Sequence, residues 1–356
     1  MSRALDPKIK EALVAAVHTP VYQSVADVLS TRDEQLLDIE VLGPGHVLAS
    51  GTYALHEGNA IAIPKFNILR AFLPAYEIFK SHLRGQYVAP EELLRATSVI
   101  LLLDPEHMTA ANARKRHIRH IKEQSPTQLH VATDAEFYLI DSLLTSRLHR
   151  HTKSPTLWGH RQWLLELSIN TQRPVGSLTT ALEKLIFVSA ERHPRNYYAW
   201  CHARYLLDLH HHHRRSGTPA VAQKHEEEPQ QGPAAALLET VTGMVKRWCF
   251  RHPDDTSGWS FLAVLVERQA AAAPTLFAET LRLVEDLSWR GEAAWCFLRG
   301  MVMHRGRLRA GQLEEFTHVL ELVHRGGRRE TATEELDRQV LANTLKWTEL
   351  YAESDC

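Results

Sequence analysis

The sequence predicts an all-α protein built as a right-handed α-α superhelix, a solenoid of helical hairpins, and three observations lead to this fold class. Apolar residues recur with helical spacing from Phe66 almost to the end of the chain. Prolines interrupt this pattern at residues 74, 90, 105, 126, 155, 174, 194, 253 and 274. Tryptophans follow several of these prolines at short distances. A helix, a proline-containing turn and a second helix that begins near a tryptophan therefore form a repeating unit.

The N-terminal part, residues 1–90, is expected to differ from the hairpin repeats of residues 91–356. We expect a helix over residues 4–36. Apolar and polar residues then alternate around Ile39 and Val41, turn signals follow, and the run ends at Ile61–Ile63. The stretch 38–63 is therefore predicted to be a short irregular or hairpin-like segment.

Four copies of the repeat align on Trp158, Trp200, Trp259 and Trp295, and a degraded copy aligns on Ala111. Successive anchors are 47, 42, 59 and 36 residues apart, which suits a pair of helices with variable turns. The longest spacing contains an insert near residues 210–233 that is rich in His, Gly, Pro, Gln and Glu. This composition predicts a disordered, exposed loop.

Each helical hairpin exposes an apolar face that it cannot bury alone, so neighbouring hairpins are expected to stack and form a concave surface for a partner protein. The tryptophans are expected to pack one hairpin on the next; they are Trp158, Trp163, Trp200, Trp259 and Trp295. His160, Arg161 and His202 are also expected to be structural residues of the repeat. For His160 and Arg161 we expect bonds from side chain to backbone between repeats, and the alternative is that they bind substrate.

The charge balance excludes some classes of function. Lys and Arg number 41 and Asp and Glu 42, so bulk charge predicts no nucleic-acid partner. No apolar stretch approaches the roughly 20 residues that span a membrane, and no secretory signal is recognisable. The four cysteines are scattered without metal-ligand spacing, which suits a reducing compartment. We expect a cytoplasmic protein with no transmembrane segment and no metal site.

One local basic run stands out against this neutral balance. Arg114, Lys115, Arg116 and His117 are followed by Arg119 and Lys122. A run around a whole helix is typical of a solvated face. The alternative is a surface that attracts an acidic tail or a diphosphate.

Residues 155–163 read Pro-Thr-Leu-Trp-Gly-His-Arg-Gln-Trp, and residues 196–202 read Asn-Tyr-Tyr-Ala-Trp-Cys-His. This pattern resembles the repeat of the protein prenyltransferase α-subunit family, and the resemblance covers about residues 90–305. The strings Ile63–Phe66 and Leu101–Pro105 look most like a divergent branch of that family, which is associated with a third geranylgeranyltransferase.

The resemblance implies the α subunit of a heterodimeric protein geranylgeranyltransferase, which is active only in complex with a β subunit. It implies the Rab-type geranylgeranyltransferase β subunit as partner and proteins with C-terminal cysteines, including a SNARE, as substrates. Zinc and geranylgeranyl diphosphate are then expected in the β subunit, and this chain is expected to hold no cofactor. The alternative is a non-catalytic helical-repeat scaffold or protein-binding module.

The resemblance also implies site residues. The family has a lysine five residues before the repeat tryptophan, and Lys153 stands five residues before Trp158. Its ammonium group and the start of the following helix would act together on a diphosphate; the alternative is an exposed turn lysine. Tyr197 and Tyr198 are expected on the substrate or diphosphate side, although helix-start packing is the alternative for Tyr197. The family pattern has tyrosine in place of Pro155 and histidine in place of Tyr198, which favours the scaffold alternative.

Overall fold

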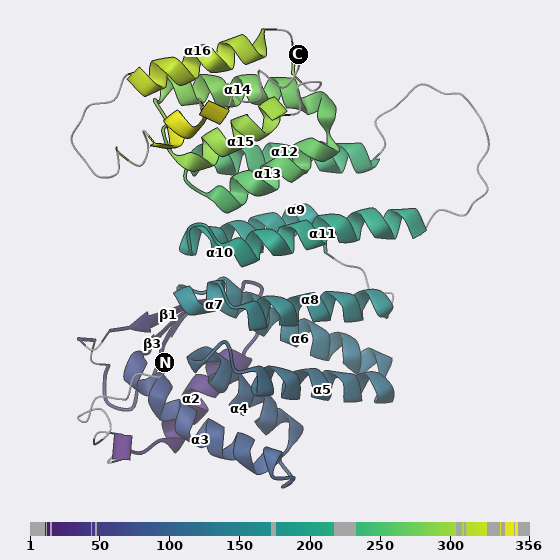
Figure 1. The fold of residues 1–356 in the computed structure, drawn as a ribbon. Helices are drawn as coiled ribbons and strands as arrows, with labels where there is room; N and C mark the ends of the chain where they lie inside the picture. Colours follow the sequence, from purple (N-terminus) through teal and green to yellow (C-terminus); the bar gives the residue numbers. More distant parts are fainter. Residues whose placement is uncertain are drawn as a thin grey trace. The chain divides into compact units, whose positions relative to one another are not determined.

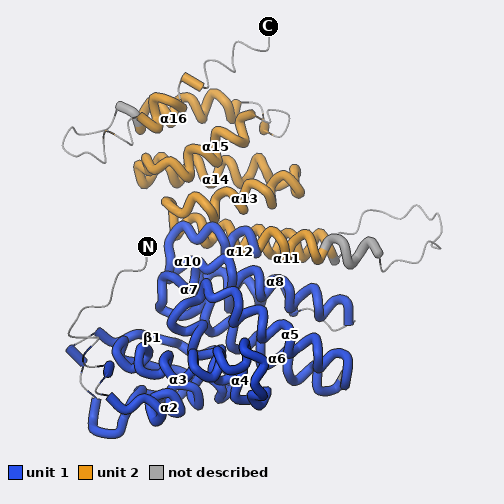
Figure 2. Tube along the Cα trace, turned by 60° about the horizontal axis from the view of Figure 1, so that its bottom comes forward, with its two compact units in different colours: residues 1–202 blue, residues 203–356 orange. Residues whose placement is uncertain are grey.

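The structure is a computed structural model of the chain, and it describes residues 11–325 except 12, 15, 44, 47, 172–175, 217–232, 304–307 and 310, together with residues 335, 339–344, 346 and 347. The chain divides into two compact units, residues 1–202 and 203–356 (Figure 2). Each unit buries apolar side chains of its own. The predicted all-α helical-repeat class is confirmed.

Unit 1 is helical apart from one small sheet (Figure 1). Its helical elements are α2 (Thr19–Ser30), α3 (Lys65–Leu83), α4 (Pro90–Leu103), α5 (Met108–Gln124), α6 (Pro126–Leu144), α7 (His149–Thr152), α8 (Pro155–Asn170), α9 (Leu178–Ala181), the π-helical η1 (Leu182–Ile186), α10 (Phe187–Arg192) and the start of α11 (Tyr197–Ser216). Its strands are β1 (Asp38–Leu42), β2 (Leu55–Glu57) and β3 (Ala60–Pro64).

The sheet lies within the segment that the sequence predicts to be irregular or hairpin-like. Strands β2 and β3 form an antiparallel hairpin, and β1 pairs in parallel with β3, with Ile39 opposite Ile61. Gly58 in the hairpin turn has a φ of 58°, a conformation that glycine adopts without a Cβ penalty. Ile39, Ile61 and Ile63 are buried, so one face of the sheet packs against the rest of unit 1.

The predicted helix over residues 4–36 is interrupted, because residues 16–18 are not helical and α2 begins at Thr19. Helix α2 ends at Ser30, whereas the sequence predicts a helix as far as residue 36, and residues 4–10 lie outside the described part of the chain. The chain after α2 bonds to α6 instead of continuing the helix. The backbone N–H of Leu37 donates to the Ser142 hydroxyl at 3.0 Å, which holds the strand-forming segment against that helix.

Helical hairpins follow in unit 1, and α4 packs against α5, α5 against α6 and α6 against α8. The second helix of each hairpin begins at a residue whose side chain accepts a backbone N–H bond from its first turn, which is the N-cap arrangement. The anchor of each repeat lies four residues later: Ala111 after His107, Trp158 after Ser154, and Trp200 after Asn196. The sequence repeat therefore marks capped helix starts.

Unit 2 contains the rest of α11 and further helices, which are α12 (Pro233–Arg251), α13 (Thr256–Arg268), the 3-10 helix η2 (Ala270–Ala272), α14 (Ala273–Asp286), α15 (Glu292–Met303) and α16 (Gln312–Arg325). Helix α12 packs against α13, α13 against α15, and α14 against α15 and α16. Asp255 caps α13 by accepting from the N–H groups of Ser257 and Gly258, and the buried Trp259 again lies four residues after the cap.

The predicted polar insert begins within a helix. Helix α11 continues through the histidine run to Ser216, so residues 210–216 differ from the expected loop. The remaining residues of the insert that precede Pro233, 217–232, lie outside the described residues. Histidine and arginine carry no backbone penalty comparable to glycine or proline, so a helix already formed from Tyr197 can extend through them.

Membrane-spanning helices were assessed within the described ranges. There, no single helix is long and apolar enough to cross a membrane. Helix α13 together with η2 and α14 reaches the required length and composition, but the pair is bent by 113° at its break. Phe261 and Phe277 of this pair are fully buried among the helices of unit 2.

Candidate functional site

Lys153 lies in the turn between α7 and α8 (Figure 1) and its side chain is exposed. It immediately precedes Ser154, whose hydroxyl accepts the backbone N–H of Leu157 at 3.1 Å and caps α8. The first N–H groups of a helix and its positive dipole end attract anions. An anion bound here would meet an ammonium group and a helix N-terminus together.

Two histidines lie beside this lysine, and the sequence analysis did not single them out. The Nδ1 atoms of His149 and His193 are 3.1 Å apart, and the two rings meet edge to face. Burial lowers the pKa of His193, and the charges of Lys153 and His149 lower it further. A bound anion would offset these charges and raise that pKa. His193 stands directly before the repeat proline, which is the signal that links it to the site.

Two carboxylates lie near the Lys153 turn, and each has another partner. The Glu106 carboxylate accepts from the Thr156 hydroxyl at 2.6 Å, in the first turn of α8. Arg150 of α7 pairs with Asp104 at 3.0 Å. Within the part of the chain that the structure describes, Lys153 has no carboxylate partner at ion-pair distance. The ammonium of Lys153 is therefore available to an external anion.

The backbone carbonyl of Thr152 joins this turn to the next hairpin. It accepts three hydrogen bonds, from the Trp158 indole N–H at 2.8 Å, the Ser189 hydroxyl at 3.2 Å and the Asn196 amide at 2.8 Å. Thr152 precedes Lys153, and Asn196 precedes Tyr197. The two predicted site segments are therefore brought to adjacent turns of unit 1.

Tyr197 and Tyr198 begin α11, and both reach the surface. The exposed fraction is 64% for Tyr197 and 37% for Tyr198, and their rings meet edge to face with centroids 5.5 Å apart. The packing alternative for Tyr197 does not fit this exposure. Both phenol rings are accessible to a molecule that approaches the start of α11.

His160 and Arg161 bind carboxylates rather than backbone groups, so the predicted side-chain to backbone bonds are wrong. The Nε2 atom of His160 lies 3.1 Å from the Glu136 carboxylate, and the Arg161 Nε donates to Asp141 at 2.7 Å. Arg161 also lies 2.8 Å from the Nε2 atom of His202. His160 and Arg161 bind carboxylates because two acidic side chains of α6, Glu136 and Asp141, face α8.

Arg114 is not part of a solvated basic face, in contrast to the expectation for the run of basic residues that begins with it. It is buried and bonds to Glu136 through two nitrogens, with distances of 2.7 and 2.8 Å. Burial alone would raise the pKa of Glu136, but Arg114 and His160 hold that pKa well below its usual range. The missed signal is that Arg114 shares an apolar helix face with Ala111 and Ile118.

The tryptophans do not all occupy the same environment. The buried ones are Trp158, Trp200, Trp259 and Trp295. Trp163 is only partly buried, in contrast to the core position predicted for it, and its ring contacts His160 and the basic side chains of α5. The Nζ of Lys115 and the Cζ of Arg119 lie 5.5 and 5.4 Å from the centre of this ring.

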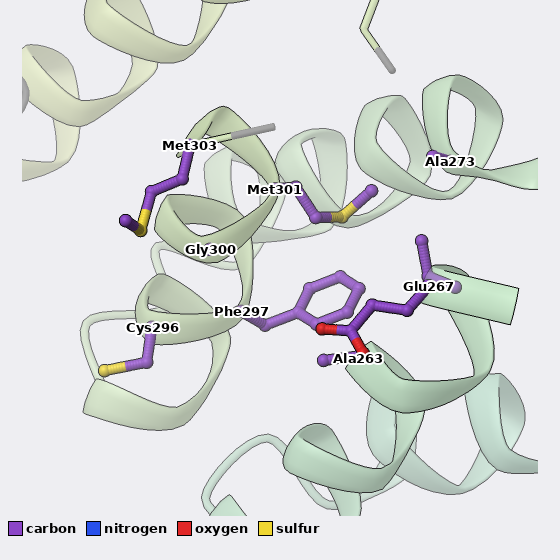
Figure 3. Close-up of a pocket in the computed structure, with 9 residues that line it drawn as sticks. Ala263, Glu267, Ala273, Cys296, Phe297, Gly300, Met301 and Met303 are labelled. Carbon is purple, nitrogen blue, oxygen red and sulfur yellow. The ribbon is translucent and has the colours of Figure 1, made fainter. Parts of the chain in front are cut away.

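A small apolar cavity lies in unit 2 (Figure 3). It measures about 150 Å³ and lies between α13 and α15. Phe297 and Met301 form part of its wall, and Glu267 reaches its edge. Most of its lining residues are apolar, and Glu267 supplies the one carboxylate among them.

The described residues were also examined for metal and thiol chemistry. Among them, no group of three or more His, Cys, Asp or Glu side chains is arranged to hold a metal ion. Cys201, Cys249 and Cys296 are free thiols. Burial raises the pKa of Cys249 and of Cys296, so both thiols stay protonated at neutral pH.

The described helices form capped hairpins, several with a buried tryptophan in the second helix, which is the architecture of an all-α helical-repeat protein. Residues 184–210, from η1 into α11, match the family described as protein prenyltransferase alpha subunit repeat. The predicted resemblance is therefore confirmed: the chain carries a repeat of this family.

Three curated relatives illustrate the similarity. The chain is 31% identical over 268 residues to protein prenyltransferase alpha subunit repeat-containing protein 1 of Danio rerio, which covers 61% of this chain and 55% of that protein. The Homo sapiens protein of the same name is 30% identical over 200 residues, 52% of this chain and 42% of that protein. Geranylgeranyl transferase type-2 subunit alpha of Rattus norvegicus is 25% identical over 204 residues, which cover 50% of this chain and 34% of that protein. The chain spans about half the length of the first of these relatives, and less of the others.

Proposed function

We propose that this chain is the α subunit of a heterodimeric protein prenyltransferase that supports geranylgeranyl transfer to C-terminal cysteines of proteins. The observation that carries the proposal is the Lys153 turn, an exposed lysine at the capped start of α8 and five residues before the buried Trp158. The matched repeat at residues 184–210 and the similarity to a type-2 geranylgeranyl transferase α subunit support it.

In this reaction a cysteine thiolate attacks the first carbon of the prenyl chain, the carbon–oxygen bond breaks, and diphosphate leaves with the electron pair. Lys153 and the N-terminus of α8 would stabilise the charge on the departing diphosphate. His193 would donate a hydrogen bond to the same anion. Tyr197, exposed at the next turn, would contact the substrate side.

The proposed partner is a β subunit of the Rab-type geranylgeranyltransferase, which would hold zinc and geranylgeranyl diphosphate. The proposed substrates are proteins with C-terminal cysteines, a SNARE among them, and the proposed location is the cytoplasm. The name of the rat relative, a type-2 α subunit, supports this choice of partner. The free thiols of the described cysteines agree with a reducing compartment.

The test is Lys153→Ala in the purified complex with a β subunit. Removal of the ammonium should lower kcat for labelled geranylgeranyl transfer by about tenfold or more, with little change in assembly, because the lysine acts on the leaving group. Lys184→Ala is the matched control, since Lys184 is exposed on η1 of the same unit. Equal turnover of the two variants would contradict the role of Lys153.

A non-catalytic scaffold is the second candidate, and two residues favour it. Pro155 and Tyr198 stand where the family pattern has tyrosine and histidine. The relatives at 30 and 31% identity are named for the repeat and not for an activity. A chain that folds normally but associates with no prenyltransferase β subunit would favour the scaffold.

A further inference from the structure

A polar groove runs between α5 and α8 of unit 1, away from the Lys153 turn. Helices α5 and α8 contact each other (Figure 1). Its lining residues are Arg119, Lys122 and Glu123 from α5 and Trp163, Glu166, Leu167 and Asn170 from α8. On each helix these positions recur every three or four residues, so each set forms one continuous face.

The groove lining carries two cations, Arg119 and Lys122, and two carboxylates, Glu123 and Glu166, and the flanking Lys115 adds one further positive charge. Arg119 and Lys122 are exposed, and within the described residues neither has a carboxylate partner at ion-pair distance. Lys115 lies at one end and is half-buried against the Trp163 ring. Burial lowers the pKa of Lys115 and the charge of Arg119 lowers it further, whereas the carboxylates of Glu166 and Glu136 act in the opposite direction. A negative ligand bound near both cations would relieve the repulsion between Lys115 and Arg119.

Trp163 adds an apolar contact to this charge. Its ring is partly exposed and lies beneath Lys115 and Arg119, each within cation-π distance. Arginine and tryptophan are among the side chains that contribute most to protein interfaces when they become buried. The groove therefore combines a ring for packing with cations that fix the direction and register of a ligand.

The dimensions fit a short peptide. On α8 the lining residues run from Trp163 to Asn170, which is seven helical steps or about 10 Å and the length of about three extended residues. Glu166 and Asn170 on this wall offer side chains that accept hydrogen bonds from the N–H groups of an extended backbone.

Two acidic side chains in the groove favour a peptide ligand over a nucleic acid. Glu123 and Glu166 line the same groove as the cations. A nucleic acid carries a negative charge at every nucleotide and would meet both carboxylates. In an extended peptide alternate side chains point to opposite sides, so its carboxylates can face the α5 cations while its N–H groups face the glutamates.

We propose that the groove between α5 and α8 binds an extended acidic segment of a partner protein, with carboxylates on Arg119 and Lys122 and an apolar side chain on Trp163. This site does not depend on the proposed transferase activity. It gives the basic run of α5 a role as a docking surface for an acidic tail.

The test measures binding of a fluorescein-labelled decapeptide with alternating Glu and Ala and one central Phe, by fluorescence anisotropy at moderate salt. We expect saturable binding that weakens as salt increases. Arg119→Glu should weaken it about fivefold or more, because an attraction becomes a repulsion. Trp163→Phe should weaken it less, since an aromatic ring remains.

Arg116→Glu is the matched control. Arg116 is exposed on the same helix, changes the net charge by the same amount, and does not line the groove. It should change the affinity by less than about twofold. Equal weakening by both variants, absence of wild-type binding, or tighter binding of a labelled single-stranded RNA decamer would overturn the proposal. Circular dichroism of each variant verifies that the fold is retained.

Discussion

Glu136 is the residue that connects three helices of unit 1. Its carboxylate contacts Arg114 of α5 and His160 of α8 while all three side chains are buried. Taking charges out of water is costly, and it is offset here because Arg114 bonds twice to the carboxylate and also donates to the carbonyl of Leu94 at 2.7 Å. The buried Arg114–Glu136 pair is stable only while both the guanidinium and the carboxylate are charged.

Glu136→Gln should therefore destabilise unit 1 strongly. It removes the negative charge and leaves the Arg114 guanidinium buried without its partner, which costs about 3–5 kcal/mol. Urea unfolding followed by circular dichroism measures the free energy of unfolding. Glu166→Gln, at an exposed position of α8, is the matched control and should change stability by less than about 0.5 kcal/mol. Similar values for the two variants would show that the buried ion pair is not important for stability.

The sequence indicated His160 and Arg161 as structural residues of the repeat but not the partners that they bind. Repeat spacing shows which positions recur along the chain, whereas the carboxylates of Glu136 and Asp141 come from the preceding helix. Their pairing depends on how α6 packs against α8. The His149 and His193 pair was missed for the same reason, because the two residues are 44 positions apart.

At the scale of elements, the turns between the paired helices determine the geometry of the candidate site. Asn196 caps α11 through the N–H of Ala199 and donates to the Thr152 carbonyl of the preceding turn at 2.8 Å. One side chain thus starts a helix and fixes the distance between two turns. Lys153 and Tyr197 are the immediate neighbours of these two bonded residues.

Asn196→Ala tests this connection. It removes the cap and one donor to Thr152, so the expected cost is about 2 kcal/mol. Ser125→Ala removes the cap of α6, an exposed bond of 3.4 Å from Gln128 N–H, and should cost only about 0.5 kcal/mol. Thermal and urea unfolding of both variants measure the difference. An equal or smaller loss for Asn196→Ala would contradict the role of this residue in joining the turns.

The helical hairpins were predictable because proline, cap residue and tryptophan mark the start of each second helix locally. The short sheet was partly predictable, since alternation at Ile39 and Val41 signals strand, but its parallel pairing with β3 joins segments about twenty residues apart. Trp163 is less buried than predicted. Its position in the helix gives no information on the lysine and arginine of α5 that contact its ring.

At the scale of the whole molecule, buried neutral histidines make stability depend on pH. Burial lowers the pKa of His151 to about 4 and that of His160 and His202 below the usual value. These groups take up protons in the unfolded chain as pH falls through about 6.5 but stay neutral when folded. The unfolded state then binds more protons, so stability is present above pH 6.5 and is lost below it.

We predict that the free energy of unfolding of unit 1 decreases between pH 7 and pH 5. Each of these histidines should contribute about 1.4 kcal/mol per pH unit once the pH is below the unfolded pKa. The low pKa of Glu136 acts only below this range. Urea titrations at several pH values measure the slope, and His151→Asn should make it shallower. Constant stability over this range would show that these histidines take up protons in the folded protein as readily as in the unfolded chain.

Co-expression with a Rab-type geranylgeranyltransferase β subunit tests most directly the proposal that this chain is the α subunit of a heterodimeric protein prenyltransferase. Size-exclusion chromatography with light scattering gives the mass of the species that forms. We predict a stable complex with one copy of each chain. Separate elution of the two chains, repeated with the other prenyltransferase β subunits, would contradict the account.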